Sequence, residues 1–187
     1  AHATDASDRA NGPGSGEGNQ SAPVTPEEPA DMFRADEGRW GSREAEIVAV
    51  ELLTADGSPA TVHASGSSLT IRMTVRATAP VPDAVFGVAI FSADGTCCYG
   101  TNTAIDGPGP QSLQGTATVA FAIDPLDLVA GSYKLDVAVH KRDGYPYDYH
   151  RLLYTFRVKS RTREVGIYAP DHRWAFSGDI RFKPTSA

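Results

Sequence analysis

The richest group of chemically versatile side chains lies in one short stretch, residues 141–150, which reads Lys-Arg-Asp-Gly-Tyr-Pro-Tyr-Asp-Tyr-His. Tyrosine rings can stack on a flat ligand, carboxylates accept hydrogen bonds, and imidazoles donate or accept them. Glycine and proline within the stretch predict a turn between two strands, a place where binding residues are common. The candidate binding residues here are Tyr145, Tyr147, Asp148, Tyr149 and, just before the turn, His140. The alternative is that Tyr147 or Tyr149 packs inward and closes one end of the domain.

A second candidate surface comes from polar side chains that alternate with apolar ones along predicted strands. Successive residues of a strand point to opposite faces, so these polar residues are expected to face outward. They are Arg72, Thr74, Arg76, Thr116, Thr118, Asp136 and His140. The alternative is an ordinary solvated sheet face. Asn102, near the end of another predicted strand, could bind a ligand or bond its own backbone.

No combination of residues indicates catalysis. The histidines after residue 38 are scattered and lack the His-x-x-x-His or Cys-x-x-Cys spacing of a metal site. The sequence also lacks a Gly-x-Ser-x-Gly nucleophile elbow and a Gly-x-x-x-x-Gly-Lys-Ser/Thr phosphate loop. Two carboxylates could act together in space, but the sequence selects no pair. We therefore predict no catalytic residue, no metal and no cofactor, and binding is the favoured role.

The elements that must position these side chains are strands. From residue 44 onward apolar and polar residues alternate, and this period of two is typical of half-buried antiparallel strands. Asp94-Gly95 between two apolar runs predicts a hairpin. The expected strands are 44–54, 68–78, 85–92, 96–103, 113–123, 132–140, 149–159 and a short 164–168. The sequence thus predicts an all-β fold, a two-sheet antiparallel β-sandwich of immunoglobulin-like or jelly-roll type.

Charge and composition divide the chain in two. Residues 1–38 hold eight acidic and two basic residues, which accounts for the whole net charge of −6, and the remainder is balanced. Because residues 1–37 contain few apolar side chains, we expect a flexible acidic linker there and one folded domain over residues 38–187. A balanced domain gives no basic surface for nucleic acid. No apolar run approaches the roughly 20 residues that span a bilayer, which predicts a soluble chain.

The two cysteines, Cys97 and Cys98, are adjacent in a predicted strand. Their side chains would point to opposite faces, so a bond between them would be strained. We expect free thiols, which favours a reducing compartment.

Several short motifs occur in an order and spacing that resemble a known family. They are Arg39-Trp40-Gly41-Ser42, Glu44-Ala45-Glu46-Ile47, Ser65-Gly66, Phe86-Gly87-Val88-Ala89-Ile90, Asp94-Gly95, Gly100-Thr101-Asn102-Thr103, Leu126 to Tyr133, Tyr147-Asp148, Phe156-Arg157-Val158, Gly166 and Trp174. Over residues 39–176 the chain resembles the C-terminal domain of the ATP-binding subunit of O-antigen polysaccharide ABC exporters, the Wzt-type carbohydrate-binding domain. No single motif is diagnostic, and the order and spacing of the set carry the resemblance.

The resemblance implies a β-sandwich that binds the exported glycan, follows a nucleotide-binding domain and contacts a membrane-embedded transporter subunit. It implies a cytoplasmic location, peripheral to the inner membrane. ATPase activity would belong to the preceding domain, because these residues contain no phosphate loop. The resemblance also implies a homodimer with exchanged C-terminal strands. The expected dimer contacts are Ile167, Tyr168, Trp174 and Phe176.

The candidate carbohydrate-binding residues are then the turn residues named above together with Arg72, Arg76, Asn102, Asp136 and His140. Two other hypotheses stay open at this point. The domain could be a structural or dimerisation sandwich without a ligand of its own, or an accessory module of a glycoside-active enzyme. Trp40 and Trp174 could stack on sugar, fill the core or form a dimer contact.

Overall fold

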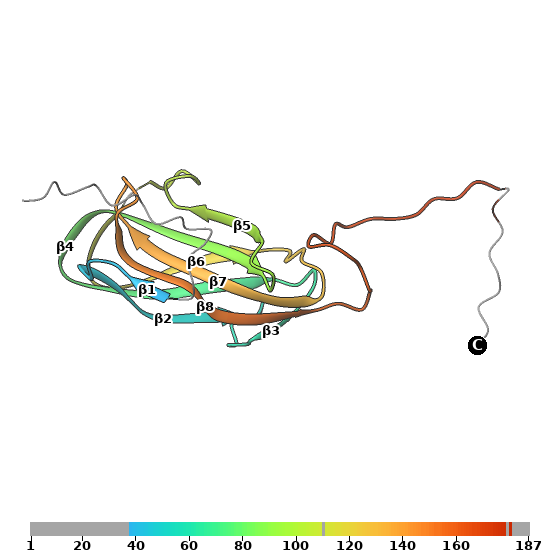
Figure 1. Cartoon of the computed structure of the whole chain (residues 1–187), viewed down its shortest axis with the longest axis horizontal. Helices are drawn as coiled ribbons and strands as arrows, with labels where there is room; N and C mark the ends of the chain where they lie inside the picture. Colours follow the sequence, from blue (N-terminus) through green and yellow to red (C-terminus); the bar gives the residue numbers. More distant parts are fainter. Residues whose placement is uncertain (1–37, 110, 179, 181–187) are drawn as a thin grey trace, which may run out of the picture. The chain divides into compact units, whose positions relative to one another are not determined.

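A computed structural model describes residues 38–109, 111–178 and 180 of the chain, and the predicted linker lies outside this part. The described residues form the predicted all-β fold (Figure 1). The strands are β1 (Gly38–Trp40), β2 (Ala45–Leu53), β3 (Val62–Ala64), β4 (Leu69–Ser92), β5 (Cys97–Asn102), β6 (Gln111–Ile123), β7 (Gly131–His140) and β8 (Pro146–Lys159). The three-residue strands β1 and β3 were not predicted, because such short strands show no alternation.

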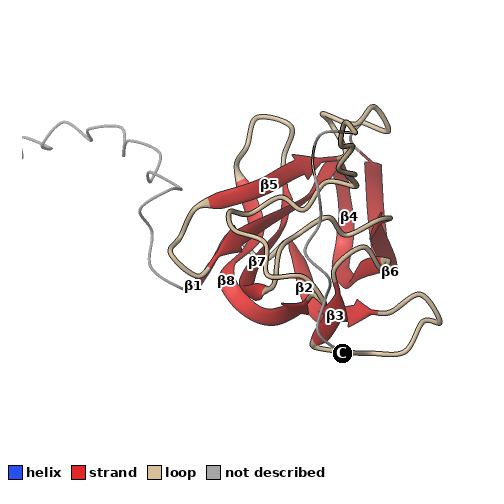
Figure 2. Ribbon diagram, turned by 90° about the vertical axis from the view of Figure 1, so that its right-hand side faces the viewer, coloured by secondary structure: helices blue, strands red, loops and turns tan. Residues whose placement is uncertain are grey.

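The long strand β4 belongs to both sheets of the sandwich (Figure 2). Its first half pairs with β2 and β6, and its second half pairs with β7 and β5. Between Ala77 and Ala84 the pairing with β6 shifts register twice. Pro80 and Pro82 in this segment donate no backbone hydrogen bond, and Asp83 has a φ of 55°. The two strands predicted at 68–78 and 85–92 are therefore one strand that bends from one sheet into the other.

The second sheet has the order β8-β7-β4-β5, and the far edge of β8 holds two short strands. β1 pairs antiparallel with Tyr149 to Arg151, and β3 pairs parallel with Arg157 to Lys159. This parallel ladder is the exception to an otherwise antiparallel fold among the described strands.

The hydrophobic core lies between the sheets and follows the predicted alternation. From β4 it takes Leu69, Ile71, Met73 and Val75, each almost inaccessible to solvent. The facing layer includes Leu135, Val137 and Val139 of β7 and Phe156 of β8. Burial of such side chains supplies most of the driving force for folding.

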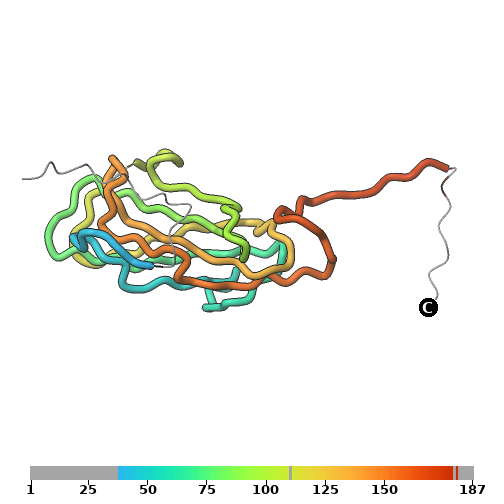
Figure 3. Tube along the Cα trace, viewed as in Figure 1, coloured from blue at the N-terminus to red at the C-terminus, as the bar shows by residue number. Residues whose placement is uncertain are grey.

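The predicted last strand at 164–168 is not formed. Instead, Tyr168 makes an isolated antiparallel bridge to Leu128. Val129 N–H donates to the Ile167 carbonyl, and Ala169 N–H donates to the Asp127 carbonyl, both at 3.0 Å. Beyond this bridge the chain leaves the sandwich, as the red end of the tube shows (Figure 3).

We expect Leu135→Ala to lower the free energy of unfolding by about 2–5 kcal/mol, because it leaves a cavity in the fully buried layer. In a domain of this size the melting temperature should fall by roughly 5–15 °C. Calorimetry checks this against Leu153→Ala, which removes a side chain that is exposed on β8 and should change little. Equal losses in the two variants would contradict the assigned core.

Candidate functional site

The tyrosine-rich turn singled out by the sequence is shorter than expected, because β8 begins at Pro146. Of its three tyrosines only Tyr145 is well exposed, at 53%. Tyr147 is buried and its hydroxyl donates to the Pro82 carbonyl at 3.4 Å, so the inward-packing alternative holds for this residue. The Lys141 ammonium lies 5.0 Å from the centre of the Tyr145 ring and 5.5 Å from that of Tyr147. The turn therefore presents one exposed aromatic ring.

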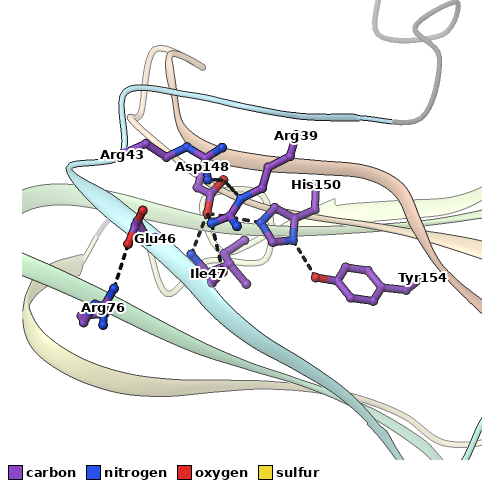
Figure 4. Close-up of polar contacts among 8 residues, drawn as sticks. All are labelled: Arg39, Arg43, Glu46, Ile47, Arg76, Asp148, His150 and Tyr154. Atoms are coloured by element: carbon purple, nitrogen blue, oxygen red, sulfur yellow. Dashed lines mark hydrogen bonds and ion pairs between the residues drawn. The ribbon is translucent and has the colours of Figure 1, made fainter.

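Behind this turn lies a buried carboxylate, Asp148 (Figure 4). Arg39 donates to both of its oxygens, at 2.9 and 2.6 Å, and Arg43 donates to Oδ1 at 2.9 Å. The Ile47 N–H donates to Oδ2 at 2.8 Å, and His150 Nε2 lies 3.3 Å from the same atom. Asp148 is 0% exposed, so its carboxylate has no surface left for a ligand.

The electrostatics of this cluster keep Asp148 ionised. Burial alone would raise its pKa, but hydrogen bonds from His150, Arg39 and the Ile47 amide outweigh burial and hold the pKa of Asp148 well below its usual range. On the other side of the imidazole, His150 Nδ1 lies 2.6 Å from the Tyr154 hydroxyl. The cluster thus ties β1, the start of β2 and β8 together through one negative charge.

The neighbouring Trp40 and Gly41 complete this attachment of β1. The Trp40 ring stacks on Tyr149, with centroids 4.7 Å apart and an interplanar angle of 13°. Gly41 has a φ of 138°, and a Cβ there would lie 2.3 Å from the Tyr147 carbonyl oxygen. Only glycine fits this close approach. The Arg39-Trp40-Gly41 motif is thereby explained as an ion pair, a ring stack and a backbone contact to β8.

The prediction that Asp136 faces solvent is wrong, since it is only 1% exposed. The β7–β8 ladder changes register beside it, which places a bulge of β8 opposite its carboxylate. Leu152, at a φ of 53°, donates its N–H to Oδ1 at 2.7 Å. The Tyr149 hydroxyl and Arg151 Nη1 lie 3.0 and 3.3 Å from Oδ2. Burial raises the pKa of Asp136, and these hydrogen bonds act against the rise. Asp136 therefore stabilises the bulge.

The remaining candidates are spread over the molecule. Arg72 and Arg76 lie on the β2–β4 face and pair with Glu51 and Glu46 at 2.9 and 3.0 Å. Asn102 accepts hydrogen bonds from the N–H groups two and three residues later, so it caps its own turn. His140 Nδ1 lies 2.6 Å from the carbonyl of the next residue. The structure does not bring these residues together.

A groove that the sequence did not reveal runs along the open side of the sandwich, between β5 and β6. Each of these strands pairs with β4, but they lie in different sheets. The main hollow has a volume of about 310 Å³, and its walls include Ile90, Leu126 and Asp127. The rings of Tyr99 and Phe121 lie across it, with centroids 6.3 Å apart and an interplanar angle of 18°. Tyr99 is half exposed.

A smaller hollow of about 60 Å³ continues the groove along the same two strands. It shares Phe121 with the main hollow and adds the polar residues Thr101, Asn102 and Asp106. We refer to both hollows together as the β5–β6 groove. Its aromatic pair was missed because Tyr99 and Phe121 each look like ordinary strand residues until the gap between the sheets is known.

In the described part of the chain, no three histidine, cysteine, aspartate or glutamate side chains are grouped so that they could hold a metal ion. Among the same residues there is no helix of the length and apolar character needed to cross a membrane. Both cysteines are free thiols, with Cys97 exposed and Cys98 half-buried in the wall of the main hollow.

Both the sequence and the fold of this chain match those of known proteins. The Wzt C-terminal domain family matches residues 36–170. The chain belongs to this family. A similar curated protein is the O-antigen export system ATP-binding protein RfbB of Myxococcus xanthus, 28% identical over 141 residues. The match covers 72% of this chain and 31% of RfbB, so this Wzt C-terminal domain spans about a third of that relative. A crystal structure of the C-terminal domain of Wzt superposes with a TM-score of 0.67 and 22% identity, over 78% of this chain and 92% of that one.

For this Wzt C-terminal domain we expect Asp148→Asn to lower the free energy of unfolding by about 3 kcal/mol, because it removes the counter-ion of Arg39 and Arg43 from a buried position. The contribution of a carboxylate with a lowered folded-state pKa is present above its ordinary pKa of 3.8 and is lost as pH falls below it. The parent should therefore lose stability steeply below about pH 4.

Urea unfolding between pH 7 and pH 2.5 tests this expectation. The difference in the free energy of unfolding between the parent and Asp148→Asn should become smaller as the pH is lowered. Asp171→Asn, which changes an exposed carboxylate, is the matched control and should follow the parent at every pH. If this difference in free energy stays constant down to pH 2.5, the charge of Asp148 is not what stabilises the fold.

Proposed function

We propose that this domain takes part in O-antigen export by binding the exported polysaccharide, without catalysis, in the β5–β6 groove. The family and the name of the relative RfbB support the export role. The observation that supports the site is the pair of aromatic rings, Tyr99 and Phe121, across an open apolar groove. Its volume of about 310 Å³ lies at the lower end of the range for small-ligand sites.

The chemistry of the groove suits a sugar chain. A sugar ring has an apolar C–H face, which can stack on an aromatic ring, and hydroxyl groups around its edge, which need hydrogen-bond partners. Tyr99 and Phe121 offer the rings, and Asp127, Thr101 and Asp106 offer oxygen atoms along the walls. Because the two hollows follow each other along the strands, the groove could hold consecutive units of a polymer.

The same family membership supports a wider setting for the domain. We propose that the domain follows a nucleotide-binding domain in the longer protein, as its share of RfbB suggests. Through that domain it would act with a membrane-embedded transporter subunit on the cytoplasmic side of the inner membrane. ATP hydrolysis would then occur in that preceding domain, and the sandwich would contribute recognition of the cargo.

We expect Tyr99→Ala and Phe121→Leu each to weaken binding of the source organism's O-polysaccharide about fivefold, because each removes one stacking surface. Isothermal titration calorimetry measures the affinity, and the absence of new reducing ends confirms that no bond is cleaved. Tyr145→Ala serves as the matched control, because it removes the exposed ring of the turn. Loss of binding in Tyr145→Ala alone would move the site to the turn, and no binding by the parent would refute the glycan function.

We also propose that the domain forms a homodimer through residues 164–176. This segment exposes several large apolar side chains, among them Tyr168, Trp174 and Phe176, and Trp174 is 80% exposed. The rings of Trp174 and Phe176 stack on each other with centroids 6.5 Å apart. Exposed apolar side chains at this density favour a protein partner, and a second copy is the partner that the family resemblance suggests.

Truncation after Ala169 should convert the dimer to a monomer, because it removes Trp174 and Phe176 but keeps the bridge between Tyr168 and Leu128. Light scattering gives the molar mass. The full-length double variant Trp174→Ser, Phe176→Ser should also be a monomer. Because it keeps the whole C-terminal segment, it shows whether the two rings, and not the length of the chain, hold the dimer together. A stable dimer in both would refute the proposed interface.

A further inference from the structure

The β5–β6 groove is built from a part of the chain without a single basic residue. Apart from Met73, every residue that lines it lies between residues 77 and 133. This stretch contains no lysine, arginine or histidine. It does contain acidic residues, namely Asp83, Asp94, Asp106, Asp124 and Asp127. The groove therefore lies in the acidic, base-free portion of a domain whose overall charge is balanced.

Two of these aspartates belong to the groove itself. Asp127 lines the main hollow and Asp106 lines the smaller one, where it accepts a hydrogen bond from the Thr101 hydroxyl at 2.7 Å. The arginines in the described ion pairs are engaged elsewhere. They pair with Asp148 and Asp136 near β1 and β8, and with glutamates on the β2–β4 face.

We propose that the groove selects uncharged sugar units and rejects anionic ones, such as units that carry a carboxylate or a phosphate. This inference rests on the proposed glycan-binding function of the groove. An anion placed there would be repelled by Asp106 and Asp127 and would find no guanidinium or ammonium group in the lining. The apolar walls around Ile90 and Leu126 would also strip water from it without compensation. A hydroxyl, in contrast, can donate to either aspartate.

The test uses one polysaccharide in two charge states. The source organism's O-polysaccharide is titrated before and after oxidation of its primary hydroxyls to carboxylates, a change that leaves the rest of each unit intact. At about 20 mM salt the oxidised form should bind at least about fivefold more weakly. Because the repulsion is Coulombic, the difference should shrink at 0.5 M salt.

Matched variants assign the effect to the groove. The double variant Asp106→Asn, Asp127→Asn keeps the side-chain shape and removes both charges, so binding of the oxidised form should recover most of the fivefold loss. Asp83→Asn is the control, because Asp83 belongs to the same base-free stretch, is exposed and does not line the groove. It should leave the discrimination unchanged.

Each other outcome overturns a separate claim. Equal binding of the two forms, or tight binding of a native polysaccharide that is itself anionic, would overturn the charge selection and leave the glycan function intact. No binding of the native form would refute the proposed function and this inference with it. If Tyr99→Ala changed the oligomeric state but not glycan binding, the groove would be a contact between copies and the inference would be wrong.

Discussion

The structure at one end of the domain depends on a single buried charge. A carboxylate without solvent is tolerated only when its oxygens are fully satisfied, and Asp148 meets this condition with donors from three successive segments that lie far from it in the sequence. Arg39 comes from β1, Arg43 from the following loop and the Ile47 amide from β2. The charge thus holds β1 and the start of β2 against β8, and Trp40 on Tyr149 strengthens the same attachment.

The two sides of the sandwich differ in how their charged and apolar side chains are arranged. On the β8 side, arginines neutralise the buried carboxylates of Asp148 and Asp136, so β1 and the bulge around Leu152 are held in one geometry. On the β5–β6 side, the sheets part, the walls are apolar and basic residues are missing from the lining. Ionic contacts close the first side, whereas the second keeps an open apolar hollow.

Sequence periodicity predicted the strands and the core well, because alternation records directly which residues face the other sheet, as in Leu69 to Val75. It failed for Asp136, since alternation says which side of a sheet a residue faces but not what covers that side. Periodicity also predicted two strands where the structure has the single strand β4. Pro80 and Pro82 interrupt the pairing but do not end the strand. Tyr99 and Phe121 were missed because their proximity depends on how two sheets part, a property of no single segment.

The proposed binding groove lies between the two sheets. Tyr99 belongs to the sheet that also contains β8 and β1, whereas Phe121 belongs to the sheet of β2 and β6. The two rings, stacked with centroids 6.3 Å apart, therefore bring the two sheets into contact at the groove. The bend of β4 near Asp83 is the direct strand connection between them, and the Asp148 cluster joins them again through Ile47 of β2. Together with the core between the sheets, these two places hold one sheet relative to the other, and the second of them also anchors β1.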